Sequence, residues 1–396
     1  MNDAVRTCDT VDGIAEDVAV DTATRFQLRV AGRTLEARGC LETLASGGTA
    51  TLEARVRAFF AARQRGPALL VGLVPFDPQA PDALFQPRSL GQGSREPASV
   101  SPRFRGEIHA EPAAAQYAAS VATAVSRLRQ SGAPLQKVVL ARTLRVQSHT
   151  PIDPHALVAR LGRDPDAVTY LAPLPVAANQ PPAWLVGASP ERLVSRRGRQ
   201  VLSHPLAGSA ARHADPEQDA RAARELLASA KDHDEHRYVV EAIVEALRPY
   251  CDAIDAAPQP TLHATTTLWH LGTRIEATLR DPTTSVATLL AALHPTPAVC
   301  GTPPTLARDA IHELEPVPRG FYAGAVGWID ANGDGDWYVA IRCARVQGTQ
   351  ACIHAGAGIV AGSEPAAEVA ETATKFGALL AALGVDGALS TDSWSC

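Results

Sequence analysis

The stretch HAGAGIVAGSEPAAEVAETATK, residues 354–375, joins a glycine-rich turn to a helix. Ser363 belongs to the residue types that cap the first turn of a helix. Glu368, Glu371 and Lys375 then recur at helical spacing, on the face that continues with leucines. Charges that point toward a core carry a large desolvation cost unless a partner meets them, so this face is predicted to line a site.

A second helix repeats the arrangement at residues 231–247, where Asp232 and Glu235 precede apolar residues on one face. Four carboxylates from two helices, converging on one cavity, suit a hard divalent cation such as Mg2+. Lys375 would then meet an anionic ligand. The alternative interpretation is a buried network of ion pairs.

The composition indicates a globular protein that acts on a small molecule. Its 396 residues carry a net charge of −5, which gives no electrostatic reason to expect nucleic acid or a membrane surface as partner. No run of eighteen apolar residues occurs and no signal peptide is recognisable, so we expect a cytoplasmic protein. The seven cysteines are scattered without a CxxC motif, which favours reduced thiols.

Along the chain, residues 1–24 show no clear periodicity and are predicted to be a disordered tail. The rest alternates between strands and helices. Helices are predicted over 52–65, 112–130, 154–161, 215–248 and 286–293. Strands are predicted over 68–75, 137–146 and 265–279, with hairpins over 184–210 and 324–346.

Four polar residues stand out within apolar strands. Lys137 begins a strand, where a lysine is more often solvated than catalytic, and Glu191 could be a carboxylic acid with a raised pKa. Arg342 follows YVAI in a predicted buried strand and is a candidate clamp for a carboxylate. His270 lies between apolar neighbours, and such a histidine is more often part of the core.

Several partial motifs are excluded by their own sequence. GASPE at 187–191 lacks the last glycine of the nucleophile elbow of serine hydrolases. The turn at 330–336 imitates a calcium loop, but Ile341 stands where calcium needs an acid. GAGIVA at 356–361 has too little chain after it for a dinucleotide fold. The basic turn at 196–199 is predicted to be solvated.

Ten segments together carry a resemblance to a known family. Between about Phe26 and Val385 the chain resembles the isochorismate synthases of the chorismate-utilising enzymes, and is most similar to the siderophore branch that makes 2,3-dihydroxybenzoate. Gly272 stands where alanine is common. The segments, in the family's order, are KVVLAR, SPERL, HPLAGSA, AKDHDEH, LWHLGT, LHPTPAVCG, GAVGWID, AIRCA, AGAGIV and ETATK.

The resemblance implies an α+β fold, a four-layer α/β/β/α sandwich with internal duplication. It implies a single chorismate-binding catalytic domain over residues 25–386, followed by a C-terminal tail over 387–396. We expect a monomer whose partner is chorismate.

The resemblance also implies roles for individual residues. Lys137 would activate a water that attacks C2 of chorismate, while Glu191 would protonate the hydroxyl that leaves C4. Mg2+ would be held by Glu235 and Glu371, with Asp232 and Glu368 in its water shell. The implied substrate-binding residues are Gly208, Ser209, His270, Ala298, Val299, Tyr322, Arg342, Gly356, Gly358 and Lys375.

Three alternative functions remain besides that of an isochorismate synthase. The first is a salicylate synthase, which eliminates pyruvate after forming isochorismate, and the second is a lyase that makes anthranilate. The third is a binding protein without turnover, which has no need of both Lys137 and Glu191. Ala298 favours a reaction that stops at isochorismate, because pyruvate-forming relatives commonly place threonine there.

Overall fold

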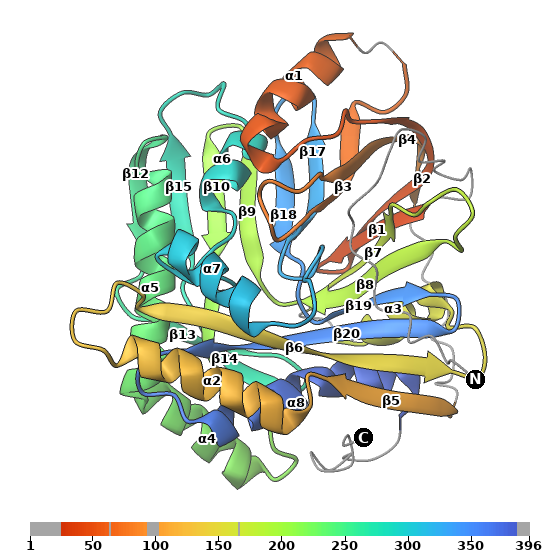
Figure 1. Ribbon diagram of the computed structural model, residues 1–396. Coiled ribbons are helices and arrows are strands. Elements are labelled where there is room, and N and C mark those ends of the chain that lie inside the picture. The colour runs from red at the N-terminus through yellow and green to blue at the C-terminus, as the bar shows by residue number, and fades with distance from the viewer. Residues whose placement is uncertain (1–24, 63–64, 93–102, 165–166, 386–396) are drawn as a thin grey trace.

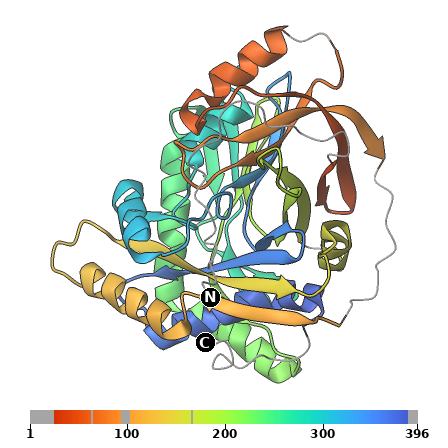
Figure 2. The same ribbon diagram turned by 45° about the vertical axis from the view of Figure 1, so that its right-hand side comes forward.

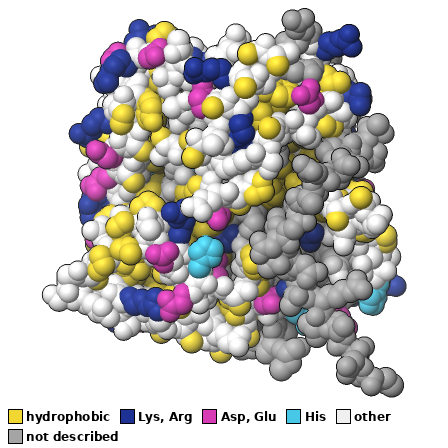
Figure 3. All heavy atoms as spheres, turned by 45° about the horizontal axis from the view of Figure 1, so that its top comes forward, with side chains coloured by type: hydrophobic (Ala, Val, Ile, Leu, Met, Phe, Trp, Pro, Cys, Tyr) yellow, Lys and Arg dark blue, Asp and Glu magenta, His cyan; other side chains and the backbone are white. Residues whose placement is uncertain are grey.

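The computed structural model describes residues 25–62, 65–92, 103–164 and 167–385, so both predicted tails lie outside the described residues. Seventeen strands of this part form one antiparallel sheet that folds over on itself, and three strands form a second sheet (Figure 1). In the described ranges, no helix is long and apolar enough to cross a membrane. On the face shown in Figure 3, basic and acidic side chains are interspersed.

The first half of the large sheet is a ladder of nine strands. Each one pairs with the next in spatial order, and β2 is the last. The order is β12 (Cys251–Ala256), β15 (Ile275–Leu279), β10 (Gln200–His204), β9 (Arg192–Arg197), β18 (Gly335–Val339), β17 (Ala325–Asp330), β3 (Leu69–Val74), β4 (Ala83–Gln92) and β2 (Arg33–Thr43).

The second half begins at β1, which pairs with β2 on one side and with β7 on the other. The two halves therefore form one continuous ladder that closes over a shared core (Figures 1 and 2). The order is β1 (Arg25–Val30), β7 (Val168–Leu174), β8 (Ala183–Ser189), β19 (Cys343–Gln347), β20 (Gln350–Ile359) and β6 (Lys137–Ser148), whose far edge carries β5 (Gly106–Glu111) and β16 (Gly301–Thr302).

Helices cover the outside of both halves, which confirms the predicted four-layer α/β/β/α sandwich (Figure 2). α1 (Leu52–Ala62), after the short η1 (Thr49–Thr51), packs with α5 (Ala230–Leu247) and α6 (Val286–Leu293) on the first half. α2 (Ala114–Leu128), α3 (Pro154–Leu161) and α8 (Pro365–Leu383) pack on the second.

The remaining elements lie beside these layers. α7 (Pro304–Leu314) packs against β6. α4 (Pro216–Ala228) packs against the three-stranded sheet of β11 (Leu206–Ala211), β14 (Leu268–Gly272) and β13 (Thr261–Ala264). This small sheet also contacts α5, so it meets the acidic face of that helix.

Successive side chains along β7 and β8 point alternately into two separate hydrophobic cores. Tyr170 and Leu185 are buried in the cluster between the two halves of the large sheet. Their neighbours Leu171 and Val186 are buried in the cluster under α3 and α8. Because successive side chains of a strand point to opposite faces, strands buried on both sides need continuous apolar runs, and β7 and β8 have them.

The chain crosses between the two halves at two neighbouring points. Glu191 lies where β8 leads into β9, and Arg342 lies where β18 leads into β19. The crossings are tied together by hydrogen bonds from Ala188 N to Arg342 O (3.1 Å) and from Val339 N to Glu191 O (3.1 Å). The prediction of a strand at Arg342 was therefore wrong. Its backbone is left-handed at φ 50°, a conformation that costs energy in a non-glycine residue.

Two predicted elements are each divided in the structure. The helix predicted over 215–248 breaks at Ser229, which has an extended backbone and accepts a hydrogen bond from Asp232 N as the cap of α5. The strand predicted over 265–279 is two strands, β14 and β15, in different sheets. No glycine or proline marks the helix break at Ser229, whereas β14 ends at Gly272, directly before the strand break.

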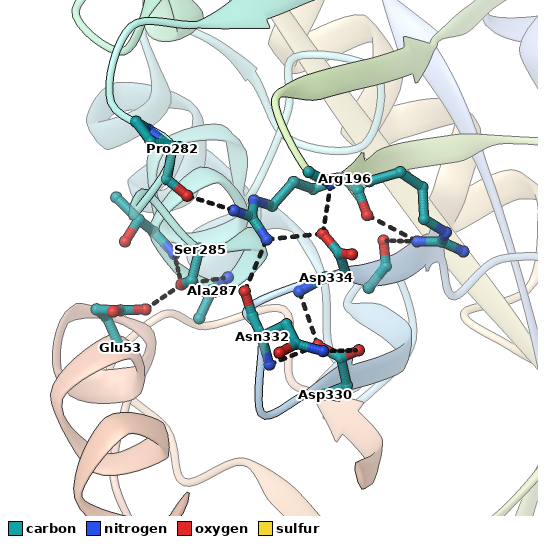
Figure 4. A network of polar contacts seen from close by, with 12 residues as sticks. Glu53, Arg196, Pro282, Ser285, Ala287, Asp330, Asn332 and Asp334 are labelled. Atoms are coloured by element: carbon teal, nitrogen blue, oxygen red, sulfur yellow. Dashed lines mark hydrogen bonds and ion pairs between the residues drawn. The ribbon is translucent and has the colours of Figure 1, made fainter. Parts of the chain in front are cut away.

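Most of the basic turn at 196–199 is exposed as predicted, but Arg196, near the end of β9, is buried and lies in a network of polar contacts (Figure 4). Its guanidinium donates to Asn332 O (2.8 Å), Asp334 Oδ1 (2.7 Å) and Pro282 O (2.6 Å). Asp330 accepts from the backbone of Asn332 and Asp334. The acids of the calcium-like turn therefore organise an ordinary hairpin between β17 and β18, as the sequence predicts.

Replacing Arg196 by Leu is expected to lower the free energy of unfolding by about 3 kcal/mol, because it leaves a carboxylate and two carbonyls without their buried donor. Urea unfolding measures the change. Arg199→Leu is the matched control, since Arg199 lies on the same turn, half-exposed beside Asp252, and should cost less than about 1 kcal/mol. Equal losses in both variants would contradict the buried network.

Candidate active site

One cavity gathers most of the predicted site residues from distant parts of the chain. All ten predicted substrate-binding residues line it, together with Glu191, Glu235 and Glu371. They come from β11, α5, β14, the loop after α6, the loop after α7, both crossings between the sheet halves, β20 and α8. The cavity therefore lies at the junction of the two sheet halves and the small sheet.

The other three predicted residues lie directly behind its wall. Lys137 is fully buried, with Nζ 3.1 Å from Glu235 Oε1. Asp232 lies behind Gly208, whose backbone is left-handed at φ 78°, and a Cβ there would lie 3.0 Å from the Asp232 Cβ. Glu368 is buried and binds Lys231 at 2.8 Å.

Glycines on β20 allow the acids and the tyrosine to approach the backbone. A Cβ on Gly358 would lie 2.1 Å from Glu235 Oε1, and a Cβ on Gly356 would lie 2.9 Å from the hydroxyl of Tyr322. His354 lies two residues before Gly356 and lines the same cavity. Sequence reasoning missed His354, although the period of two along a strand places 354, 356 and 358 on one face.

Lysines neutralise three of the four predicted metal-binding acids. Besides the pairs made by Lys137 and Lys231, Glu371 forms an ion pair with Lys375, whose Nζ also donates to Gly356 O (2.7 Å). Ser209 Oγ donates to Glu371 Oε1 (3.2 Å). Across the described ranges, no three acidic, histidine or cysteine side chains are arranged as ligands of one metal ion.

The acidic cluster nevertheless fits a hard cation. Glu368 Oε2 is buried without a hydrogen-bond partner. Burial raises the pKa of Glu368, and the charge of Glu371 raises it further. Burial also raises the pKa of Asp232, with added repulsion from Glu235 and Glu371. Carboxylates that repel one another in a buried place are the donor set that Mg2+ prefers.

Glu191 is held in its neutral form. Burial raises the pKa of its carboxyl to about 8, although the charges of Lys137 and Arg342 lower it. The side chain is therefore largely protonated at neutral pH, and its position on the cavity wall lets it donate a proton to a bound molecule.

The other end of the cavity carries unshared positive charge. Among the described residues no carboxylate lies within ion-pair distance of Arg342. Tyr322 lies nearby and stacks on His354, with ring centroids 4.7 Å apart and an interplanar angle of 16°. Burial lowers the pKa of His354 to about 3 and that of His270 well below its usual range. Both rings are neutral, and their Nε2 atoms are buried without partners.

Small apolar residues complete the wall. Ala298 and Val299 line the cavity from the loop after α6, and Arg319 fixes that loop by donating to Val299 O (2.7 Å). The seven wall residues that the sequence did not single out all lie within two positions of a residue that it did. They are Val139, Pro190, Leu206, Ala207, Ile341, His354 and Ala355.

Comparison with known proteins identifies the class. Residues 84–384 match the family described as chorismate binding enzyme, and the chain belongs to this family. Among its relatives are isochorismate synthases: it is 42% identical over 346 residues to DhbC of Bacillus subtilis, covering 85% of this chain and 86% of that protein. It is 37% identical over 324 residues to EntC of Escherichia coli, covering 80% and 81%.

A solved structure agrees with the fold. The crystal structure of a putative 2,3-dihydroxybenzoate-specific isochorismate synthase, DhbC from Bacillus anthracis, superposes with a TM-score of 0.86 at 39% identity. The match covers 92% of this chain and 98% of that one.

Proposed function

We propose that the protein is an isochorismate synthase, which isomerises chorismate by adding water at C2 and losing the hydroxyl from C4. The observation that carries this proposal is the protonated Glu191 on the cavity wall, with Lys137 buried directly behind that wall. The charge of the lysine reaches the carboxyl, which is itself protonated near neutral pH. A base and an acid beside the same cavity can together add water at one ring carbon and remove a hydroxyl from another.

Each proton has a place to go in this scheme. Lys137 would take a proton from the water whose oxygen bonds to C2 of the ring. Glu191 gives its proton to the hydroxyl at C4, which leaves as water while the ring double bonds shift between the two carbons. One water enters and one leaves, so the product is an isomer of the substrate.

Positive groups at the far end would hold the substrate. Arg342 and Lys375 supply charge for the enolpyruvyl carboxylate, and Tyr322 and the amides near Gly356 and Gly358 supply hydrogen bonds. The unshared charge of Arg342 supports this role. Lys375 would exchange its contact with Glu371 for the substrate.

Mg2+ is the cation that we propose for the acidic cluster. Glu235 and Glu371 would hold it directly, with Asp232 and Glu368 around its water shell. When bound, the ion would supply positive charge for the ring carboxylate of chorismate. The unpartnered oxygen of Glu368 and the mutual repulsion of the acids support this assignment.

We further propose that the product feeds 2,3-dihydroxybenzoate and siderophore synthesis in the cytoplasm, with the chain acting as a monomer. Support for the branch comes from the names of the DhbC and EntC relatives. Incubating the purified chain with chorismate and Mg2+, then separating the products by chromatography, tests the activity. Release of salicylate and pyruvate in step with chorismate loss would replace this proposal with a salicylate synthase.

Ala298→Thr is expected to raise pyruvate release by on the order of tenfold, because a hydroxyl on this wall can reposition the enolpyruvyl side chain by hydrogen bonding, and small displacements change rates strongly. Coupled detection of pyruvate measures it. Ala298→Val is the matched control, since it adds similar volume without the hydroxyl. If the valine variant released as much pyruvate as the threonine variant, the added volume would be the cause and hydrogen bonding by the hydroxyl would be excluded.

A further inference from the structure

Two histidines face each other away from the cavity, where the large sheet meets the small one. His204 ends β10 and His263 lies on β13, and their Nε2 atoms are 3.2 Å apart. The ring planes are inclined by 74°, with centroids 4.4 Å apart. Both side chains are partly exposed, so solvent can reach them.

Both rings are neutral at physiological pH. Burial is the main cause that lowers the pKa of each ring, and the pKa of His204 falls to about 4. A neutral imidazole offers one nitrogen lone pair, and either Nε2 can supply it, depending on the tautomer. Thr261 Oγ1, 3.0 Å from His263 Nε2, adds an oxygen beside the pair.

Gly272 makes the arrangement possible. A Cβ at this position would lie 2.5 Å from His263 Cδ2 and 2.6 Å from Leu206 Cδ2, both closer than real contacts allow. Alanine would therefore push the ring of His263 out of place. The glycine in LWHLGT and the two facing histidines thus belong to one local arrangement.

The positive groups around the pair are engaged elsewhere. Arg192 donates to Tyr338 OH (3.0 Å) and lies over its ring. Arg274 binds Glu276 at 2.6 Å. The charges of Arg192 and Arg274 still reach His204 and lower its pKa further, which keeps the ring neutral.

We propose that His204 and His263 form a binding site for a borderline divalent transition-metal ion, for which Zn2+ is the probe. Two imidazole nitrogens bound to one tetrahedral Zn2+ at about 2.0–2.1 Å lie roughly 3.3 Å apart, close to the 3.2 Å observed, and on binding the two ring centroids must move from 4.4 Å to roughly 5 Å apart. Water, with Thr261 Oγ1 at hand, completes the coordination. This site differs in chemistry from the carboxylate cluster, because imidazole suits Zn2+ whereas oxygen donors suit Mg2+.

Isothermal titration of the full chain with Zn2+ in saturating Mg2+, which occupies the acidic cluster, tests the site. One equivalent is expected to bind, and His204→Gln and His263→Gln should each weaken binding at least tenfold. Gly272→Ala should weaken it similarly without removing a ligand. His109→Gln is the matched control, because it removes an exposed histidine on β5 and should leave the affinity unchanged.

Co2+ provides a second measurement on the unmodified protein. Visible absorption bands typical of tetrahedral nitrogen coordination are expected, and Zn2+ should abolish them. Unchanged Zn2+ affinity in the double variant of both histidines would overturn the proposal. So would the absence of Zn2+ binding and of these bands in the unmodified chain at metal concentrations up to 1 mM, roughly the weak end of specific binding.

Discussion

Glu191→Gln is expected to reduce kcat on chorismate by roughly a thousandfold, within the range of about 10²–10⁴ that general acid catalysis contributes. The amide keeps the size of the side chain but cannot give a proton to the hydroxyl that leaves C4. Because only proton transfer is lost, KM should change little. Steady-state kinetics at saturating Mg2+ measure both constants.

The pH dependence gives the same residue a second readout. Burial raises the pKa of Glu191 from its ordinary 4.5 to about 8, so the acid is protonated below that pH and ionised above it. The value of kcat/KM should therefore fall as the pH rises through about 8, and this fall should be absent in Glu191→Gln. Glu241→Gln, on the exposed side of α5, is the control and should retain both the rate and the pH profile. A fully active Glu191→Gln enzyme would exclude Glu191 as the acid.

Glu235→Gln is expected to lower Mg2+-dependent turnover by roughly a hundredfold or more, and Glu371→Gln should act in the same way. Each change removes an anionic oxygen from a hard cation, and the charge of the ligands sets its affinity. Glu235 also lies 3.1 Å from Lys137 Nζ, so the variant removes the ion-pair partner of Lys137 as well. Titrating activity against Mg2+ should show a raised half-saturation concentration.

Calorimetric titration with Mg2+ separates metal binding from catalysis. Glu235→Gln should bind Mg2+ more weakly even without substrate, whereas a role limited to Lys137 would leave the binding intact. Asp234→Asn is the matched control, because Asp234 neighbours Glu235 on α5 but faces solvent beside Arg237. Near-normal turnover of Glu235→Gln at low Mg2+ would rule out the acidic cluster as the metal site.

The sequence predicts the layers of the fold well, because periodicity indicates the helices and strands and the family resemblance indicates how they stack. The helix over 154–161 has the predicted ends, and the Asn/Asp/Gly turn between β17 and β18 is where its residues indicate. The errors in the predicted helices and strands occur where contacts between distant residues determine the backbone conformation. Ser229 breaks a helix without glycine or proline, and Arg342 bends the chain in a run that reads as a continuous strand.

Ion pairs account for the other differences between the predicted site and the structure. The spacing of Glu371 and Lys375 by four residues is visible in the sequence, and the structure pairs them. The pair of Lys137 and Glu235 joins a strand to a helix far along the chain, so no local pattern could reveal it. The sequence predicts a solvated Arg196, because the partners that bury it come from other turns. The site roles of these residues remain predictions.

The pairing of β6 with β20 has a consequence for the timing of synthesis. β6 ends at Ser148, whereas β20 begins at Gln350, so residues 149–349 must emerge before that edge finds its partner. Until then a nascent chain presents a bare, strongly apolar strand edge of the kind that promotes aggregation. α8, which carries Glu371 and Lys375, emerges later still. The catalytic centre can therefore assemble only after translation is nearly complete.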